Sequence, residues 1–365
     1  MDRATVDVYD RKGASWAARR SPVRRDDARA FAEAVGTGRR VDLGCGAGRY
    51  LGDLGRPVVG LDASMGMLDL CRGVTPGPPL VRGDLERLPF GAGVFAGAWA
   101  NMSYLHLPSV RLPLALADLH RTLAVGAALD LQVLAGDYEG HALPQDDVGG
   151  RFFASWTAPR LSDVLVGAGF DVDDLTVQGD ALRARARRSR TLADTVGPGM
   201  RLLFVGLNPS LYAADAGVGY ARPGNRFWPA VLCAGVVTRH ADAVHALVAH
   251  HVGMTDLVKR ATAGAADLTT AEYSEGFGRV ERVVEWLAPG AVCFVGLAGW
   301  RAAVDRHATA GVQPRRVAGR PVYVMPSTSG ANAASSLASL VTHIGAAAAL
   351  ATDVAAGDWD RATGD

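Results

Sequence analysis

Several features are scarce in this chain, and each absence narrows its class. The four cysteines lie far apart, without a Cys-x-x-Cys pair or a histidine at metal-ligand spacing: Cys45, Cys71, Cys233 and Cys293. This pattern argues against a zinc site or an iron–sulfur cluster, so we expect no metal and reduced thiols. No stretch approaches the roughly 18 uninterrupted apolar residues of a membrane-spanning helix, and no apolar leader opens the chain. We therefore expect a cytoplasmic protein without membrane contact.

An excess charge of either sign is also missing. Lysine and arginine total 38 against 37 aspartate and glutamate, so the overall field does not favour nucleic acid, and any DNA contact needs a local patch. Lys12 and Lys259 are the only lysines, which points to an arginine-rich coding bias. With 49% apolar and 21% charged residues, the composition is that of a folded protein. A length of 365 residues suggests two domains.

The first half alternates between strand and helix signals. Residues 40–62 form an apolar run, a glycine-rich turn, a helical stretch and a second apolar run, which indicates a βαβ unit. Further strands are expected at 79–84, 94–101 and 127–134, and helices at 110–123 and 158–169. Two extended runs, 170–177 and 182–188, indicate an antiparallel hairpin that closes the sheet. This order predicts a mostly parallel, doubly wound α/β domain over residues 1–188.

A second domain is expected at 189–352, followed by a tail at 353–365. The basic cluster around Arg183, Arg185 and Arg187 has period two, which favours an edge strand with one solvated face, although a DNA-binding arm is the alternative. We expect a short helix at 191–196, a Gly-Pro-Gly break, and new strands at 201–205, 291–296 and 321–325. Each domain is thus predicted to be a three-layer α/β/α structure.

A glycine-rich turn follows the first strand. Gly44, Gly46 and Gly48 lack Cβ atoms, so a ligand can lie against the backbone there, and the next helix can meet a carboxylate. The Gly-x-Gly-x-Gly spacing disfavours a dinucleotide pyrophosphate site. Asp62 ends the second strand, where an acid commonly accepts ribose hydroxyls, and Asp84 ends the third. These residues predict a site for an adenosyl or anionic ligand.

Residues 40–134 resemble the core of class I S-adenosylmethionine-dependent methyltransferases. The resemblance implies S-adenosylmethionine as cofactor, with Asp42 and the glycine loop around its methionine part, Asp62 at the ribose, and Asp84 with Leu85 at the adenine. The acceptor stays open, because no Asn-Pro-Pro-Tyr or Pro-Cys motif follows the fourth strand. His106 is either a general base or a buried structural histidine.

The second half carries a polar turn after a buried strand. Asn208 lies in Val205-Gly-Leu-Asn-Pro-Ser210, immediately beyond the strand end where open α/β sheets bind ligands. By itself, an asparagine beside proline is more often a turn residue. Two downstream segments, Tyr220–Trp228 and Val324–Gly330, favour the functional reading instead.

These three segments resemble the mismatch-specific uracil- and thymine-DNA glycosylase family over about residues 195–350. The resemblance implies that Asn208 positions the attacking water and that Tyr220 stacks on a flipped base. The implied base pocket consists of Gly206, Leu207, Pro209, Ser210, Tyr220 and Asn225. The implied DNA-binding loop consists of Ser327, Ser329, Gly330, Ala331 and Asn332, and Phe227 with Trp228 would form the core below.

Two departures from the family pattern are visible. Ala331-Asn332-Ala333 lacks the leucine and arginine that bacterial relatives use as a wedge, which puts reading of the opposite guanine in doubt. Ser210 replaces a glycine, which favours uracil over thymine. The predicted partners are duplex DNA with a mispaired pyrimidine, S-adenosylmethionine and an unknown methyl acceptor, and the glycosylase needs no cofactor. The alternatives are a non-catalytic S-adenosylmethionine-binding module beside the glycosylase, and a non-catalytic DNA-damage binder beside the methyltransferase.

Overall fold

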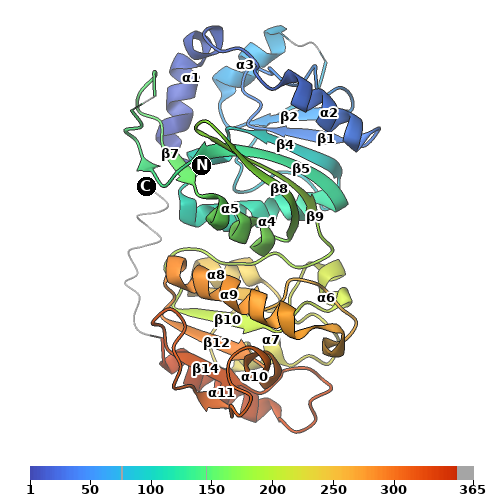
Figure 1. The fold of residues 1–365 in the computed structure, drawn as a ribbon, viewed down its shortest axis with the longest axis vertical. Helices are drawn as coiled ribbons and strands as arrows, with labels where there is room; N and C mark the ends of the chain where they lie inside the picture. Colours follow the sequence, from blue (N-terminus) through green and yellow to red (C-terminus); the bar gives the residue numbers. More distant parts are fainter. Residues whose placement is uncertain (75–76, 145, 352–365) are drawn as a thin grey trace. The chain divides into compact units, whose positions relative to one another are not determined.

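The computed structural model describes residues 1–74, 77–144 and 146–351 and divides into two compact units (Figure 1). The first contains the described residues up to Val166 and Phe170–Ser189. The second contains Gly167–Gly169 and the described residues from Arg190 onward. The tail expected at 353–365 lies outside the described residues. The expected α/β class is confirmed for both units, since each has a mostly parallel sheet with helices on its faces.

The first unit has a sheet with strand order β3-β2-β1-β4-β5, all parallel, continued by the antiparallel pair β9 and β8. A short pair, β6 and β7, extends from the end of β5. The bounds are β1 Arg40–Leu43, β2 Val58–Asp62, β3 Leu80–Arg82, β4 Phe95–Asn101, β5 Leu123–Ala135, β6 Glu139–Gly140, β7 Phe153–Trp156, β8 Phe170–Gln178 and β9 Ala181–Arg188. The expected strands and the closing hairpin are therefore present.

Helices cover both faces of this sheet (Figure 1). They are α1 Arg3–Ala18, α2 Arg25–Val35, α3 Met65–Val74, α4 Leu112–Thr122 and α5 Ala158–Gly167, with short 3-10 turns at Tyr104–His106 and Ser109–Arg111. On the α2 and α3 face, Phe31 and Tyr50 pack against the buried ring of Trp99. These rings form an apolar core between the strands and the helices on this face of the sheet.

The basic strand β9 corrects one expectation. It is not an edge strand, because it lies between β5 and β8. Its arginines pair with carboxylates of the same unit: Arg183 with Asp27 and Asp130, Arg185 with Asp174, and Arg187 with Asp173. The period-two pattern reflects these ion pairs on one face and buried alanines on the other. These pairs give the arginines a structural role within the sheet.

The second unit has a five-stranded sheet with order β11-β10-β12-β14-β13, in which only β13 is antiparallel. The strands are β10 Leu202–Gly206, β11 Val252–Asp256, β12 Ala291–Val295, β13 Gly311–Val312 and β14 Val322–Met325. The helices are α6 Leu211–Ala216, α7 Phe227–Cys233, α8 Ala243–His250, α9 Thr270–Leu287, α10 Leu297–Ala303 and α11 Leu337–Ala349, with a 3-10 turn at Ala265–Asp267.

The core of this unit has two apolar layers. On one face, Phe227 and Trp228 of α7 and Ile344 of α11 pack on the strands. On the other, Phe294 of β12 meets the ring of Trp300 from α10 at 4.9 Å. The helix expected at 191–196 is absent, because this segment runs in extended form, and Thr195 makes two backbone hydrogen bonds to Met254 of β11.

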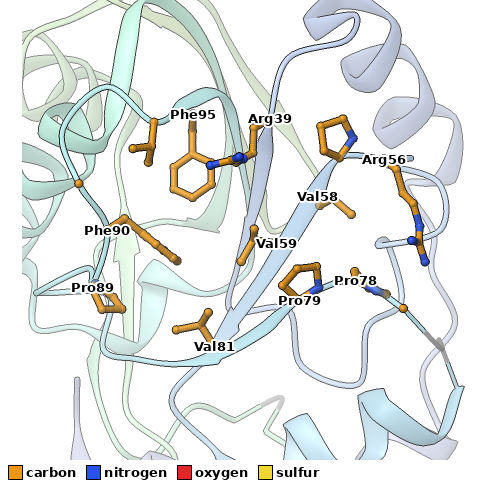
Figure 2. Close-up of a pocket in the computed structure, with 14 residues that line it drawn as sticks. Arg39, Arg56, Val58, Val59, Pro78, Pro79, Val81, Pro89, Phe90 and Phe95 are labelled. Carbon is orange, nitrogen blue, oxygen red and sulfur yellow. The ribbon is translucent and has the colours of Figure 1, made fainter.

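A concave pocket of about 610 Å³ lies in the first unit at the amino ends of β1 to β4 (Figure 2). Val59, Val81 and Phe90 line it, and Arg39 and Arg56 stand at its side. The predicted cofactor residues follow the carboxyl ends of the same strands. The pocket is therefore at the opposite edge of the sheet from the predicted methyl-donor site.

Two absences hold for the described residues. No helix in this part of the chain is long and apolar enough to cross a membrane. Within the same residues, no group of three or more histidine, cysteine, aspartate or glutamate side chains is arranged to hold a metal ion.

A group of buried charged side chains around Asp194, next to β11, gives a prediction for stability. Asp194 is buried and accepts from Lys259 and Arg279, each at 2.7 Å, so both cations depend on it. Asp194→Asn should destabilise the second unit by about 3 kcal/mol or more, because it leaves buried positive charge uncompensated. Denaturant unfolding checks this, with the exposed Arg190–Asp215 pair as control. Asp215→Asn should cost much less than Asp194→Asn, because both partners of that pair are in contact with solvent. Equal losses in the two variants would refute the role of the network.

Candidate functional sites

The glycine loop of the first unit lies directly after β1, at the carboxyl edge of the sheet. Gly44, Gly46 and Gly48 have φ values of +73°, +55° and +79°, a region that side chains disfavour. A Cβ atom at Gly44 would collide with Ser103, and one at Gly48 would lie 2.5 Å from the Cys71 sulfur. The loop therefore requires glycine both for its backbone conformation and for its close packing.

Two carboxyl groups flank this loop, Asp42 buried and Asp62 partly buried. Asp62 Oδ2 accepts from the Gly46 amide at 2.8 Å, and its Oδ1 accepts from the Ser64 amide at 2.9 Å. Asp42 is almost fully buried, and its Oδ2 has no hydrogen-bond partner among the described residues. Burial raises the pKa of Asp42 well above its ordinary value, with a further rise from Asp62. A cationic ligand would relieve this repulsion, and a donor group would satisfy the orphaned oxygen.

The third predicted acid is more exposed. Asp84 follows β3 and accepts from the Glu86 amide at 2.9 Å and from the Met1 amino group at 2.7 Å. Leu85 beside it is fully buried. The structure thus brings the residues after β1, β2 and β3 to one edge of the sheet, as their parallel pairing requires.

His106 lies after β4 at the same edge, and both of its ring nitrogens form hydrogen bonds. Its Nδ1 donates to the Phe152 carbonyl at 2.7 Å, because a carbonyl can only accept. Its Nε2 then accepts from the Tyr9 hydroxyl at 3.0 Å. Burial lowers the pKa of His106 to about 4. Both nitrogens are used in structural contacts, which favours the structural interpretation over a general base.

Asn208 follows β10 at the carboxyl edge of the second sheet. Its Nδ2 donates to Thr262 Oγ1 at 2.8 Å and to the Arg260 carbonyl at 3.0 Å. Thr262 in turn donates its hydroxyl proton to the Gly264 carbonyl, so its oxygen can only accept from Asn208. This network fixes the orientation of the amide. The Oδ1 atom is left to accept a hydrogen bond from a ligand or water.

Tyr220 and Asp256 meet beside the same strand end. A Cβ atom on Gly206 would collide with Asp256 Oδ1 and would lie 2.9 Å from the Tyr220 hydroxyl. The Tyr220 ring stacks on Phe227, with centroids 3.9 Å apart and an interplanar angle of 17°. Its hydroxyl is buried without a partner among the described residues. Gly206 thus makes room for a carboxyl and a phenol at the floor of the site.

Asp256 is a weaker acid than an ordinary aspartate. It ends β11 and lies beside Gly206 in the parallel register. Burial raises its pKa to about 6, although Lys259 and Arg279 oppose the rise. A carboxyl group with such a pKa exchanges its proton close to neutral pH, which suits acid–base chemistry.

The other residues of the predicted base pocket have local structural roles. Ser210 caps α6 by accepting from the Ala213 amide at 3.1 Å, so its hydroxyl serves the helix. Asn225 accepts from the Phe227 amide at 2.9 Å. The Leu207 and Pro209 carbonyls accept from the Val258 and Thr262 amides, which ties the Asn208 turn to the chain after β11.

Comparison with protein-family models matches each half of the chain to a different family. Residues 41–129 match the model described as "Methyltransferase domain", and residues 193–345 match "Uracil DNA glycosylase superfamily". The chain holds a methyltransferase domain followed by a uracil DNA glycosylase superfamily domain. These matches contain the glycine loop with its acids in the first case, and Asn208, Tyr220 and Asp256 in the second.

Three solved methyltransferase structures are similar to part of this chain, each with a sequence identity below 25%. A S-adenosylmethionine-dependent methyltransferase from Methanosarcina mazei is 16% identical, covering 42% of this chain and 92% of its own, with a TM-score of 0.38. One from Mesorhizobium loti is 21% identical, covering 45% and 96%, with a TM-score of 0.37. The Burkholderia thailandensis 1,6-didemethyltoxoflavin-N1-methyltransferase is 21% identical, covering 50% and 84%, with a TM-score of 0.39.

The predicted DNA-binding loop of the glycosylase superfamily domain follows β14 and is organised by Arg226. This guanidinium donates to the Ser329 carbonyl at 3.0 Å, the Asn332 carbonyl at 2.6 Å and the Ser335 carbonyl. Asn332 Nδ2 donates to the Ser327 carbonyl at 2.8 Å. A Cβ atom on Gly330 would lie 3.0 Å from the Gly224 carbonyl oxygen, so the loop passes close to the turn before α7.

The sequence pattern did not predict a role for Asp256 or Arg226. The strand that carries Asp256 is short and contains Gly253, so it gave no clear β signal, and the acid was not placed beside Asn208. The signal available was Asp256 itself, an acid directly after an apolar run in Val-Gly-Met-Thr-Asp. Arg226 was visible in the Asn225-Arg-Phe-Trp228 segment, but its three carbonyl partners are about 100 residues away in sequence.

The raised pKa of Asp256 predicts a pH-dependent cost in stability. Its folded-state pKa of about 6 exceeds the ordinary value of 3.8, so stability falls as the pH rises from about 4 to about 6, and the full cost is present above pH 6. Asp256→Asn should therefore stabilise the glycosylase superfamily domain at pH 8 by on the order of 1–3 kcal/mol, and the gain should vanish below about pH 4. Denaturant unfolding at several pH values measures this. A loss of stability at pH 8 would contradict the assigned environment.

Proposed function

We propose that the glycosylase superfamily domain hydrolyses the N-glycosidic bond of a flipped uracil, or of a thymine or another modified pyrimidine, mispaired with guanine in duplex DNA. One observation carries this proposal: Tyr220 and Asp256 meet at Gly206, two residues before Asn208, at the carboxyl edge of the sheet. This arrangement supplies a water-orienting amide, an aromatic ring and a titratable carboxyl within one site. The domain match supports DNA as the substrate.

The flipped base would stack on Tyr220. Phe227 holds the rear face of this ring, so the ring has a fixed orientation before the substrate arrives. A rigid stacking surface lowers the entropy cost of holding an extrahelical base, and a mispaired base costs less to unstack than a paired one. Burial raises the pKa of Tyr220 well above its ordinary value, so its phenol stays neutral and can donate a hydrogen bond.

The attacking water would lie between Asn208 and the sugar. The free Oδ1 of Asn208 accepts one water proton as a hydrogen bond, while the amide nitrogen stays tied to Thr262 and Arg260. A water oxygen lone pair attacks C1′, the bond from C1′ to the base nitrogen breaks, and its electrons leave with the base as an anion. Asp256 takes the proton that the water loses, which its pKa of about 6 permits at neutral pH.

The loop of Ser327, Ser329, Gly330, Ala331 and Asn332 would contact the DNA backbone. Arg226 and Asn332 hold it in one conformation through backbone carbonyls, so its small residues can face a phosphate at little entropic cost. Because Ala331-Asn332-Ala333 offers no large wedge, we infer weak selection for guanine opposite the excised base.

We infer that the methyltransferase domain binds S-adenosylmethionine at the carboxyl edge of its sheet. The glycine loop fits a ligand against the backbone, Asp62 suits the ribose, and Asp84 with Leu85 suits the adenine. The buried Asp42 and the partly buried Asp62 favour a cationic ligand, and this cofactor carries a positive charge. When bound, it supplies an electrophilic methyl group. Since both nitrogens of His106 are occupied, a cofactor-binding module without methyl transfer is the second candidate for this domain.

Base excision from a G·U duplex tests the proposal for the glycosylase superfamily domain. Wild type should release uracil at a rate that rises about tenfold per pH unit up to about pH 6 and then levels off, following Asp256. Asn208→Ala and Asp256→Asn should each slow release by roughly 100-fold or more, while DNA affinity changes little. Asp215→Asn, an exposed position, serves as control.

Alkali cleavage of the labelled strand, with a G·T duplex in parallel, measures these rates. Excision by Asn208→Ala at the wild-type rate would contradict its role in positioning water. A wild type that binds these duplexes without cleaving them would leave the domain as a DNA-damage binder.

A further inference from the structure

Helix α1 crosses the edge of the sheet that holds the donor site. Asp10 Oδ1 accepts from Ser64 Oγ at 2.6 Å and from the Gly66 amide at 2.9 Å, directly after the ribose acid at the end of β2. At the other side, Thr5 Oγ1 accepts from the Phe152 amide at 2.8 Å. Figure 1 shows α1 beside α3. The helix therefore extends over the donor site and restricts the approach to it.

Aromatic side chains line the underside of this cover. Tyr9 and Trp16 of α1 meet edge to face, with centroids 5.4 Å apart. Tyr9 also contacts His106, whose ring packs on Phe153 at 5.0 Å. Arg49, which follows the last glycine of the donor loop, lies over the Trp16 ring at 4.5 Å. Arg20 and Arg151 also lie over this ring, at 5.9 and 6.0 Å, so flat rings and three guanidinium groups gather on the side of α1 that faces His106.

Arg49 differs from the other two arginines in this cluster. Arg20 pairs with Asp147 at 2.7 Å. Arg151 lies 5.1 Å from the Phe153 ring centre and pairs with the buried Asp146, so its charge is neutralised. Arg49 is partly buried, and no described carboxylate lies within ion-pair distance of it; its only hydrogen bond goes to the Ala17 carbonyl at 3.4 Å. Burial lowers its pKa. A partly buried cation without a counter-charge favours an anionic ligand.

We propose that the methyl acceptor is a small planar molecule bearing a carboxylate, bound under α1 with its ring against Trp16 and its carboxylate on Arg49. This rests on the proposed donor site. A lone pair of an acceptor oxygen or nitrogen attacks the methyl carbon, the carbon–sulfur bond breaks with its electrons passing to sulfur, and the acceptor loses its proton to water. Duplex DNA does not fit this description, because α1 covers the approach and no base carries a carboxylate.

Binding to the full chain loaded with S-adenosylhomocysteine tests the acceptor class. The probes are 4-hydroxybenzoate, salicylate and indole-3-carboxylate, each compared with its carboxamide by calorimetry. At least one carboxylate should bind tenfold or more tighter than its amide. Arg49→Gln should remove that preference and leave the S-adenosylhomocysteine affinity within twofold. Arg72→Gln, an exposed arginine of α3, should change neither.

The cofactor has a carboxylate of its own, and the Arg49→Gln variant distinguishes binding of this carboxylate from binding of the acceptor carboxylate. If Arg49→Gln weakens S-adenosylhomocysteine as strongly as the probes, Arg49 holds the cofactor, and the proposal fails. It also fails if no carboxylate is preferred over its amide, or if labelled S-adenosylmethionine methylates duplex DNA. A wild type that does not bind S-adenosylhomocysteine would refute the donor site itself, which is a separate failure.

Discussion

Both units depend on one constraint, the parallel pairing of their central strands. Parallel pairing places all carboxyl ends at a single edge, so residues far apart in sequence meet there. In the first unit this places Asp42, Asp62 and His106 at one edge, and in the second it pairs Gly206, two residues before Asn208, with Asp256. At each edge a glycine allows the backbone to pass where a Cβ atom would collide, with Ser103 at Gly44 and with Asp256 at Gly206.

Each site also holds a carboxyl group in a costly environment. Asp42 has a buried oxygen without a partner, and the pKa of Asp256 is raised to about 6. Both features oppose folding, and the surrounding structure offsets them through its buried core and, in the second unit, through the ion pairs of Asp194 with Lys259 and Arg279. Unfavourable groups that persist at a strand edge are a common sign of function.

Much of this arrangement was predictable from local sequence. The glycine loop, its following acids and the Asn208 turn have fixed spacings that predict where the strands end and which residues follow them. The closing hairpin of the first sheet was also predictable, but its position was not, because the period-two pattern of Arg183 to Arg187 does not distinguish a solvated edge from an interior strand lined by ion pairs.

Contacts between distant segments were beyond the sequence. Asp256 lies 48 positions from Asn208 along the chain and becomes a site residue only through the register of β10 and β11. The cover formed by α1 depends on Asp10 and Tyr9 reaching Ser64 and His106, and none of these residues has a local signal for that contact. The segment at 191–196 reads as helix locally, but its backbone pairing with Met254 keeps it extended.

The central claim is that each unit works at the carboxyl edge of its sheet, and amide hydrogen exchange of the full chain tests it most directly. S-adenosylhomocysteine should slow exchange at 42–48, 62–67 and 84–86, and a duplex with an abasic-site analogue should slow it at 206–210, 256–262 and 327–332. Protection by S-adenosylhomocysteine at the opposite edge instead, around the pocket of Val59, Val81 and Phe90, or by DNA outside these loops, would contradict the account.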